Sequence, residues 1–201
     1  LQSQINPHFL FNTINTIASL TRTDPAQART LLREFAKFYR STLEDSRDLI
    51  EFQREVEQTQ RYFMFELARF GEDRLELICD IQPEVNEMMV PPFLLQPLVE
   101  NAVRHAMPSE GKLTIRVTGM RTGDDVIVSV IDDGNGMTQE ACQNILHPSS
   151  TQGMGIAVGN VHDRICGYFG PGTRLEAESE LGKGTTVRLV LVDGAIRQWH
   201  E

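Results

Sequence analysis

The sequence predicts an α+β protein in which an N-terminal helical hairpin precedes an α/β sandwich. Two observations predict this class. Up to about Gly71 the apolar residues recur at helical spacing, as Leu10, Ile14 and Ile17 do. Beyond Gly71, apolar strands and helical stretches follow one another without strict alternation, which favours one antiparallel-rich sheet with helices on one face.

The first part of the chain is expected to form three helices. The first two make a hairpin around TRTDPAQ, where Asp24 can cap the second helix and Pro25 fits its first position. A third helix is expected over about Leu49–Phe70, with Gly71 as its C-terminal stop. Because a hairpin exposes two apolar stripes, we expect two chains to form a four-helix bundle. The alternative is that the hairpin packs onto the C-terminal part of its own chain.

The second part of the chain is expected to contain five strands and three helices. The strands are expected at 74–81, 112–120, 125–132, 173–180 and 185–192, and the helices at 91–107, about 139–146 and about 156–168. Gly123 and Asp124 are expected to turn one hairpin, and LGKG the other. We therefore expect a hairpin domain at 1–46 and a second domain at 47–201, with a hinge near 45–50.

Composition excludes some functions and leaves others open. The net charge of −9 over 201 residues argues against nucleic-acid binding, which needs clustered Lys and Arg. Cys79, Cys142 and Cys166 follow no metal-binding spacing and are expected to be free thiols in a reducing cytoplasm. No apolar run reaches the length of a membrane span. Since the chain opens inside an expected helix, we expect a soluble fragment whose membrane anchor lies upstream.

The stretch VENAVRH carries the first candidate chemistry. On a helix, Asn101 and His105 are four residues apart and share a face, and Glu100 and Arg104 form a second such pair. A carboxamide oxygen can ligate Mg²⁺, and cationic groups beside it can meet phosphate charge. The alternative is a solvent-exposed face with an ordinary ion pair.

The stretch DDGNGM follows an apolar strand. Asp132 lies where that strand ends, and Gly134 and Gly136 allow close backbone approach to a ligand. A buried carboxylate there can accept a hydrogen bond from an amino group such as that of adenine. The alternative is an ordinary turn after a strand.

Two glycine-rich stretches follow. GMGIAVGN, which contains Gly153 and Gly155, leads into an expected helix whose N-terminal amides favour an anion. GKGTT, which contains Thr185, is the fourth candidate, and its alternative is a simple hairpin turn in which Thr185 only caps or pairs. Each stretch is weak evidence by itself, but their order and spacing together match one ATP-binding scheme.

In that order the four stretches resemble the Bergerat-type (GHKL) ATPases. Within that group, QINPHFLFNTINTI, PPFLLQPLVENAVRH and GNVHDRI resemble the LytS/YehU/YpdA-type sensor histidine kinases. The resemblance covers nearly the whole chain up to about Val192. It implies a Bergerat-type sandwich for the second domain and ATP with Mg²⁺ as cofactors.

The resemblance makes His8 the phosphoacceptor, which attacks ATP as a neutral imidazole. Pro7 would bend the helix beside it, and Asn12, one turn further on, would orient the ring or the phosphate. Many histidine kinases carry an acidic residue directly after the histidine. Here that position is Phe9, which leaves the general base unassigned.

The resemblance also assigns roles in the nucleotide pocket. It makes Asn101 the Mg²⁺ ligand, places Arg104 and His105 at the phosphates, and lets Glu100 orient a metal-bound water. Asp132 would read adenine. The remaining expected contacts are Gly134, Gly136, Gly153, Gly155 and Thr185, with 147–152 as a lid that is poorly ordered without nucleotide. Pro97 stands where many kinases carry a second Asn.

The expected function is ATP-dependent autophosphorylation of His8, followed by transfer to an aspartate of a response regulator. The resemblance implies a regulator of the LytTR type and a cytoplasmic location beneath a membrane-anchored sensor. The main alternative is a GHKL ATPase or ATP-gated dimerisation module without phosphohistidine. A scaffold that docks a regulator but binds no nucleotide is a third hypothesis, and the intact ATP-site stretches argue against it.

Overall fold

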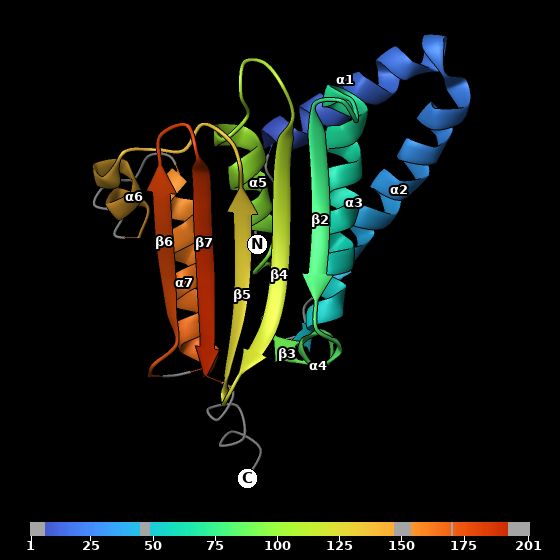
Figure 1. Ribbon diagram of the computed structural model, residues 1–201. Helices are drawn as coiled ribbons and strands as arrows, with labels where there is room; N and C mark the ends of the chain where they lie inside the picture. Colours follow the sequence, from blue (N-terminus) through green and yellow to red (C-terminus); the bar gives the residue numbers. More distant parts are fainter. Residues whose placement is uncertain (1–6, 45–48, 147–153, 170, 193–201) are drawn as a thin grey trace.

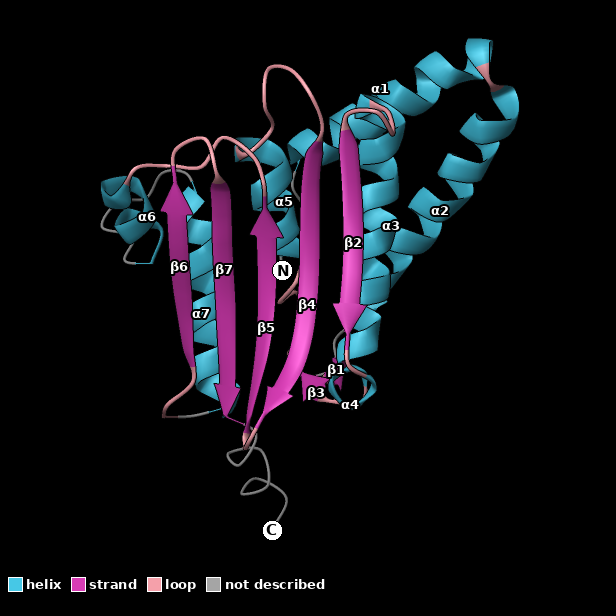
Figure 2. Cartoon of the chain, in the orientation of Figure 1, coloured by secondary structure: helices cyan, strands magenta, loops and turns pink. Residues whose placement is uncertain are grey.

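The computed structural model describes residues 7–44, 49–146, 154–169 and 171–192. A layer of helices covers one face of a sheet, and a helical hairpin projects from one side (Figures 1 and 2). The helices are α1 Pro7–Thr23, α2 Pro25–Glu44, α3 Phe52–Phe70, α4 Pro83–Asn86, α5 Gln96–His105, α6 Gln139–Leu146 and α7 Met154–Phe169. The strands are β1 Ile50–Glu51, β2 Leu75–Ile81, β3 Met89–Val90, β4 Leu113–Thr122, β5 Asp125–Asp132, β6 Arg174–Glu180 and β7 Gly184–Val192.

The main sheet has five strands in the order β2-β4-β5-β7-β6. Only the β2–β4 pair is parallel, and the other three pairs are antiparallel. Helices α3, α5 and α7 lie behind the sheet in Figure 1, and the opposite face is open. The expected α+β class, with an antiparallel-rich sheet covered on one face, is confirmed.

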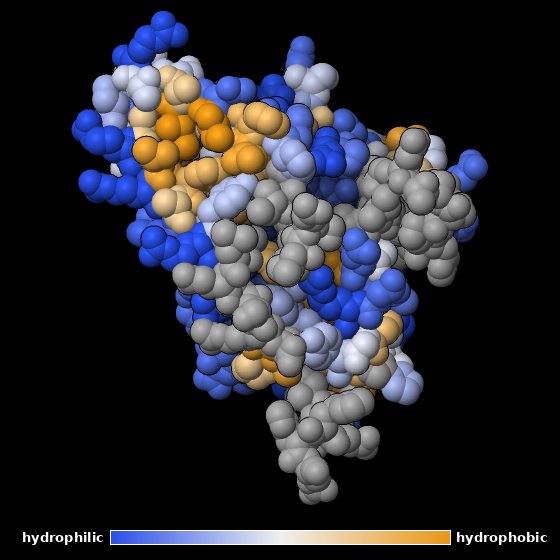
Figure 3. Space-filling view, turned by 180° about the vertical axis from the view of Figure 1, so that it is seen from behind, coloured by the Kyte–Doolittle hydropathy of each residue, from blue (hydrophilic) through white to orange (hydrophobic). Residues whose placement is uncertain are grey.

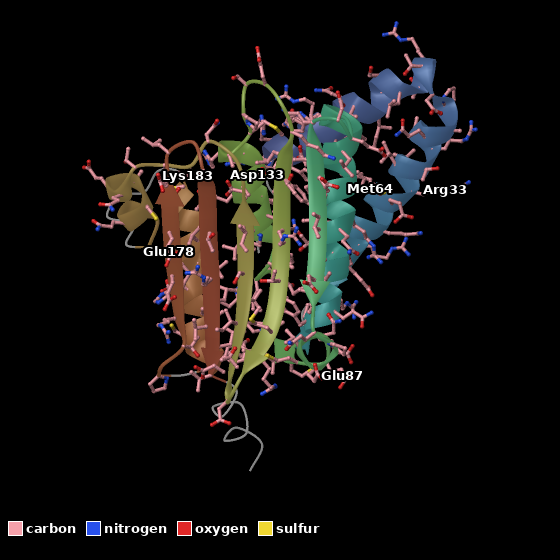
Figure 4. All side chains as sticks on the ribbon, viewed as in Figure 1. Arg33, Met64, Glu87, Asp133, Glu178 and Lys183 are labelled. Atoms are coloured by element: carbon pink, nitrogen blue, oxygen red, sulfur yellow. The ribbon has the colours of Figure 1, made fainter. Side chains whose placement is uncertain are left out.

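Alternation along the strands separates the two faces of the sheet. Val126, Val128 and Val130 of β5 are buried against the helix layer, and Asp132 continues the same face. The open face carries charge pairs, such as the Arg188 guanidinium 2.9 Å from a carboxylate oxygen of Glu178, which Figure 4 labels on β6. A polar side chain at the end of β5 therefore points into the helix-covered side, where a site can form.

The hairpin begins and turns as its residues predict. Asp24 caps α2, because its Oδ1 accepts a hydrogen bond from the Gln27 N–H at 2.9 Å, and Pro25 is the first helical residue. At the end of α3, Gly71 adopts a φ of 93°, which glycine tolerates best.

An aromatic cluster joins the hairpin to α3 of the same chain. The ring centroid of Phe9 lies 5.0 Å from that of Tyr62, 5.7 Å from that of Phe38 and 5.9 Å from that of Phe65. All four side chains are buried, and such edge-on aromatic contacts add to the stabilisation from buried area. The hairpin thus packs against its own chain, which is the arrangement that we gave as the alternative.

The hairpin nevertheless keeps an exposed apolar surface. Phe11, Ile14 and Leu32 are 66%, 47% and 57% exposed. From behind, the space-filling view shows a hydrophobic area over this part of the molecule (Figure 3). A patch of this kind is typical of an interaction surface, so the packing against α3 leaves room for the expected dimer.

One expected helix starts later than the sequence indicates. The helix expected from residue 91 begins only at Gln96. Pro92 disfavours helical backbone before it, and Phe93 has a φ of 63°. The carboxylate of Glu55 accepts hydrogen bonds from the N–H groups of residues 93–95. These groups are therefore satisfied without helical hydrogen bonds.

The other expected elements are present with small shifts at their ends, whereas β1, β3 and the short α4 were not expected. Most of the expected hinge, 45–48, lies outside the described residues. Cys79, Cys142 and Cys166 are free. None of the helices within the described ranges has the length and hydrophobicity needed to cross a membrane.

Candidate functional site

A pocket opens where β5 and β7 meet the inner face of α5. It is lined by Leu98, Asn101, Ala102, His105, Ala106, Val130, Asp132, Gly136, Met137, Thr185 and Val187. Asp132 and Thr185 are direct partners in the β5–β7 register, so both side chains point to the same side of the sheet. Apolar walls around a few polar groups are typical of a site for a flat, partly polar ligand.

Asp132 is the buried charge of this pocket. Its Oδ1 accepts the N–H of Gly134 at 3.1 Å and that of Thr185 at 3.2 Å. Burial raises the pKa of Asp132 to about 6, and the neighbouring charge of Asp133 adds to this effect, although the two backbone N–H groups oppose it. Because both hydrogen bonds go to Oδ1, Oδ2 is the oxygen left for a donor on a ligand.

The glycines after Asp132 are required by the protein's own backbone. A Cβ atom on Gly134 would lie 2.0 Å from the carbonyl oxygen of Ala106, at the end of α5. Gly136 has a φ of 60°, and a Cβ there would lie 2.0 Å from the carbonyl oxygen of Glu180. These close approaches bring the loop against α5 and the β6–β7 turn, which shapes one side of the pocket.

Ser179 was not expected from the sequence, yet it joins three segments beside the pocket. Its Oγ lies 2.9 Å from Oγ1 of Thr185, accepts the N–H of Met137 at 2.9 Å and donates to the carbonyl oxygen of Gly184 at 3.0 Å. Thr185 is thus held from the side by a neighbouring strand. In the sequence, Ser179 is simply a polar residue within the strand expected at 173–180. Polar residues in strands are too common to indicate a site.

The inner face of α5 supplies the other polar groups. Asn101 and His105, four residues apart, both line the pocket as their spacing predicts. Burial lowers the pKa of His105, and the adjacent positive charge of Arg104 lowers it further, so a neutral imidazole is favoured. A carboxamide beside a ligand's phosphates suits Mg²⁺, which keeps several waters and needs few protein oxygens.

Glu100 and Arg104 lie on an adjacent face of α5 and line a different pocket. This second pocket is also lined by His8 of α1 and residues of α3. Each residue turns an α-helix by about 100°, which places the pair of Glu100 and Arg104 just over a quarter of a turn from Asn101 and His105. We expected all four side chains in the nucleotide pocket. The structure instead places Glu100 and Arg104 in a different pocket from Asn101 and His105.

His8 is exposed on α1, and Asn12 lies one turn further along the helix. The Asn12 Nδ2 atom is 3.2 Å from Nδ1 of His8, close enough to orient the ring. The helix begins at Pro7 in the structure, and the residues before it, where the expected bend would show, lie outside the described ranges. So do Gly153 and the expected lid at 147–152, whereas Gly155 lies in the first turn of α7.

Two family models match the chain. Residues 1–75 match the model for histidine kinase, and residues 93–194, about half of the chain, match that for histidine kinase-, DNA gyrase B- and HSP90-like ATPase. The first match contains His8, and the second contains the whole of the pocket around Asp132.

Curated relatives agree with these matches. The chain is 40% identical over 195 residues to sensor protein LytS of Bacillus cereus, covering 95% of this chain and 33% of that protein. It is 39% identical over 193 residues to sensor protein LytS of Bacillus subtilis, covering 93% of this chain and 32% of that protein. The chain thus spans about a third of the length of these relatives.

Solved structures share the fold. The catalytic domain of histidine kinase ThkA covers 72% of this chain, with a TM-score of 0.55 and 16% identity, and 94% of that domain is covered. The histidine kinase domain of the blue-light activated kinase of Erythrobacter litoralis covers 90% of this chain, with a TM-score of 0.56 and 15% identity, and 82% of that domain is covered. With the two family matches and the identity to LytS, the chain belongs to the histidine kinase-, DNA gyrase B- and HSP90-like ATPases, and within them to the LytS-type sensor histidine kinases.

Proposed function

We propose that the chain binds ATP with Mg²⁺, transfers the γ-phosphoryl group to His8, and passes it to an aspartate of a response regulator. One observation carries the proposal. A chain of this family places an exposed histidine, oriented by Asn12, on a hairpin next to a domain whose pocket holds a buried, ligand-facing Asp132. The identity to the LytS sensors, which are longer proteins, supports the same reaction.

Each residue of the nucleotide pocket has a proposed task. Asp132 accepts a hydrogen bond from the adenine amino group through Oδ2, and Thr185 supports that contact. Asn101 ligates Mg²⁺, which neutralises phosphate charge when it is bound. His105 contacts the phosphates as a neutral donor. Gly153 and Gly155 remain the proposed phosphate-side glycines, and residues 147–152 the proposed lid.

The alternative of a GHKL ATPase without phosphohistidine finds less support. In that reaction a carboxylate beside the nucleotide would activate water. Glu100 faces the His8 pocket rather than Asn101, and its Oε1 accepts a hydrogen bond from Gln96 at 2.7 Å. This arrangement favours histidine chemistry over ATP hydrolysis, and the proposed water-orienting role of Glu100 loses support with it.

The partners follow from the same proposal. Two chains pair through the exposed apolar face of the hairpin, and a regulator, of the LytTR type by family resemblance, docks near His8. From the resemblance to the longer LytS sensors, we propose that the chain acts as part of a sensor anchored in the cell membrane. We propose no nucleic-acid partner for the chain itself.

Phosphorylation measured on the intact protein tests the proposal. The chain is incubated with Mg-ATP beside His8→Ala and Asp132→Asn, and the label is tested for stability in acid and base. An acid-labile, base-stable phosphate that is absent from both variants is the expected result. ATP turnover that His8→Ala leaves unchanged, without any phosphoprotein in the wild type, would support the ATPase instead.

A further inference from the structure

A hollow of about 210 Å³ lies between α1, α3 and α5. His8 reaches it from α1, Tyr62 and Glu66 from α3, and Glu100 and Arg104 from α5. At about 30 Å³ for each water molecule, it has room for several waters between these side chains. The hollow is separate from the nucleotide pocket, because the two have no lining residue in common and use adjacent faces of α5.

Glu66 is the buried carboxylate of this hollow. The residue is 5% exposed, the hydroxyl of Tyr62 donates a hydrogen bond to it, and the guanidinium of Arg69 lies 3.5 Å from its Oε2. Among the described residues, this long ion pair is the contact of Oε2, which has no hydrogen bond of good geometry. Because the ion pair with Arg69 compensates the burial only in part, this oxygen keeps capacity to accept a proton from a group in the hollow.

The residue directly after His8 in the sequence is not acidic, so a carboxylate that accepts the proton of His8 must lie elsewhere. Phe9 occupies that position, and its ring is buried among Phe38, Tyr62 and Phe65. An acidic residue cannot replace Phe9 without breaking this cluster. Any carboxylate that serves His8 must therefore come from another helix, and α3 places Glu66 in the same hollow.

We propose that Glu66 accepts the proton that His8 loses when it is phosphorylated, a role that rests on the proposed kinase function. One ring nitrogen of His8 forms the N–P bond with its lone pair, while the bond from the γ-phosphorus to the bridging oxygen breaks and ADP leaves with that electron pair. The proton on the other ring nitrogen passes to Glu66, directly or through a water, and the carboxylate becomes a carboxylic acid.

The charges around the hollow suit this role. Burial raises the pKa of Glu66, and the charge of Glu100 raises it further, whereas Arg69 and the Tyr62 hydroxyl lower it. Arg104, which also faces the hollow, contributes a fixed positive charge. A carboxylate whose pKa lies above the usual range is a better proton acceptor near neutral pH.

The test compares Glu66→Gln with Glu57→Gln in the full chain. Both variants remove one carboxylate from α3, but Glu57 is exposed and away from the hollow. The measured quantity is the rate of phosphohistidine formation with Mg-ATP, together with ATP affinity and the unfolding midpoint. We expect Glu66→Gln to be slower by about 10²-fold, with ATP affinity unchanged, and Glu57→Gln to match the wild type.

The pH profile separates proton transfer from a merely structural role. As the pH falls, Glu66 of the wild type is protonated, so the ratio of wild-type to Glu66→Gln rates should shrink, whereas a structural effect would leave it constant. Glu66→Asp should recover part of the rate. If Glu66→Gln does not fold, Glu66→Asp takes its place. The ratio of wild-type to Glu66→Asp rates must then also shrink as the pH falls.

Equal rates for Glu66→Gln and the wild type at every pH would overturn the proposal while leaving the kinase function in place. A wild type that forms no acid-labile phosphate would overturn the proposed function itself, so the two failures are distinguishable.

Discussion

The carboxylate of Glu55 and the guanidinium of Arg164 bind the same short segment of backbone, residues 92–95. Glu55 accepts the N–H groups of Phe93, Leu94 and Leu95 at 2.6, 2.8 and 2.9 Å. Arg164 donates to the carbonyl oxygens of residues 92 and 93. Helices α3 and α7 are thereby joined through the segment that leads into α5, the helix that lines both pockets.

Glu55→Ala tests how much this contact contributes to the stability of the fold. The change leaves three buried N–H groups without their acceptor and Arg164 without a nearby negative charge. We expect the free energy of unfolding, measured in urea, to fall by about 3–5 kcal/mol. Glu57→Ala, an exposed residue on the same helix, should change it by less than about 0.5 kcal/mol. Equal effects of the two variants would contradict the assignment.

ATP affinity should depend on pH through Asp132. Burial raises the pKa of this carboxyl to about 6, and the proposed adenine contact uses the ionised form. Affinity measured by calorimetry should therefore be constant above this pH and weaken as the pH falls through it, with protons released on binding. Asp132→Asn should bind weakly and without this dependence. Asp133→Asn should keep the affinity at neutral pH and move this dependence to lower pH, because the Asp133 charge raises the pKa of Asp132 while its side chain binds the N–H of Thr114 at 2.7 Å (Figure 4).

Gly134→Ala should damage the pocket from the backbone side. Its new Cβ would lie 2.0 Å from the carbonyl oxygen of Ala106, so the loop after β5 must move away from α5. We expect ATP affinity to fall at least tenfold and the unfolding midpoint to drop. Gly167→Ala on α7 meets nothing within 4 Å and should stabilise the chain by up to about 1 kcal/mol. Normal ATP binding by Gly134→Ala would refute this explanation of the glycine.

Mixed dimers should show transfer between chains. His8 and the nucleotide pocket belong to two separate pockets on adjacent faces of α5 with no lining residue in common, and we expect the ATP for one His8 to come from the partner's pocket. When Asp132→Asn and His8→Ala chains are mixed, we expect label on the Asp132→Asn chain. Labelling only in homodimers that keep both residues would instead indicate transfer within one chain.

Much of the fold was predictable, because the strands carry long apolar runs and the helices have clear ends. Alternation fixed which residues of β5 face inward, and the four-residue spacing on α5 correctly predicted two polar pairs. The start of α5 was not predictable, because the residue that holds segment 92–95, Glu55, lies on another helix. The His8–Glu66 neighbourhood was missed for the same reason, since no local pattern joins residues so far apart.

The two pockets on α5 also differ in how much other proteins share them. The nucleotide pocket belongs to a fold that serves histidine kinases, DNA gyrase B and HSP90, so an inhibitor that competes with ATP there faces many similar targets. The hollow around His8 is built from the hairpin, α3 and the outer face of α5. A compound that fills it would block the acceptor histidine while ATP stays bound, and its selectivity would rest on the residues of the hairpin and α3, which lie outside the match to the shared ATPase family.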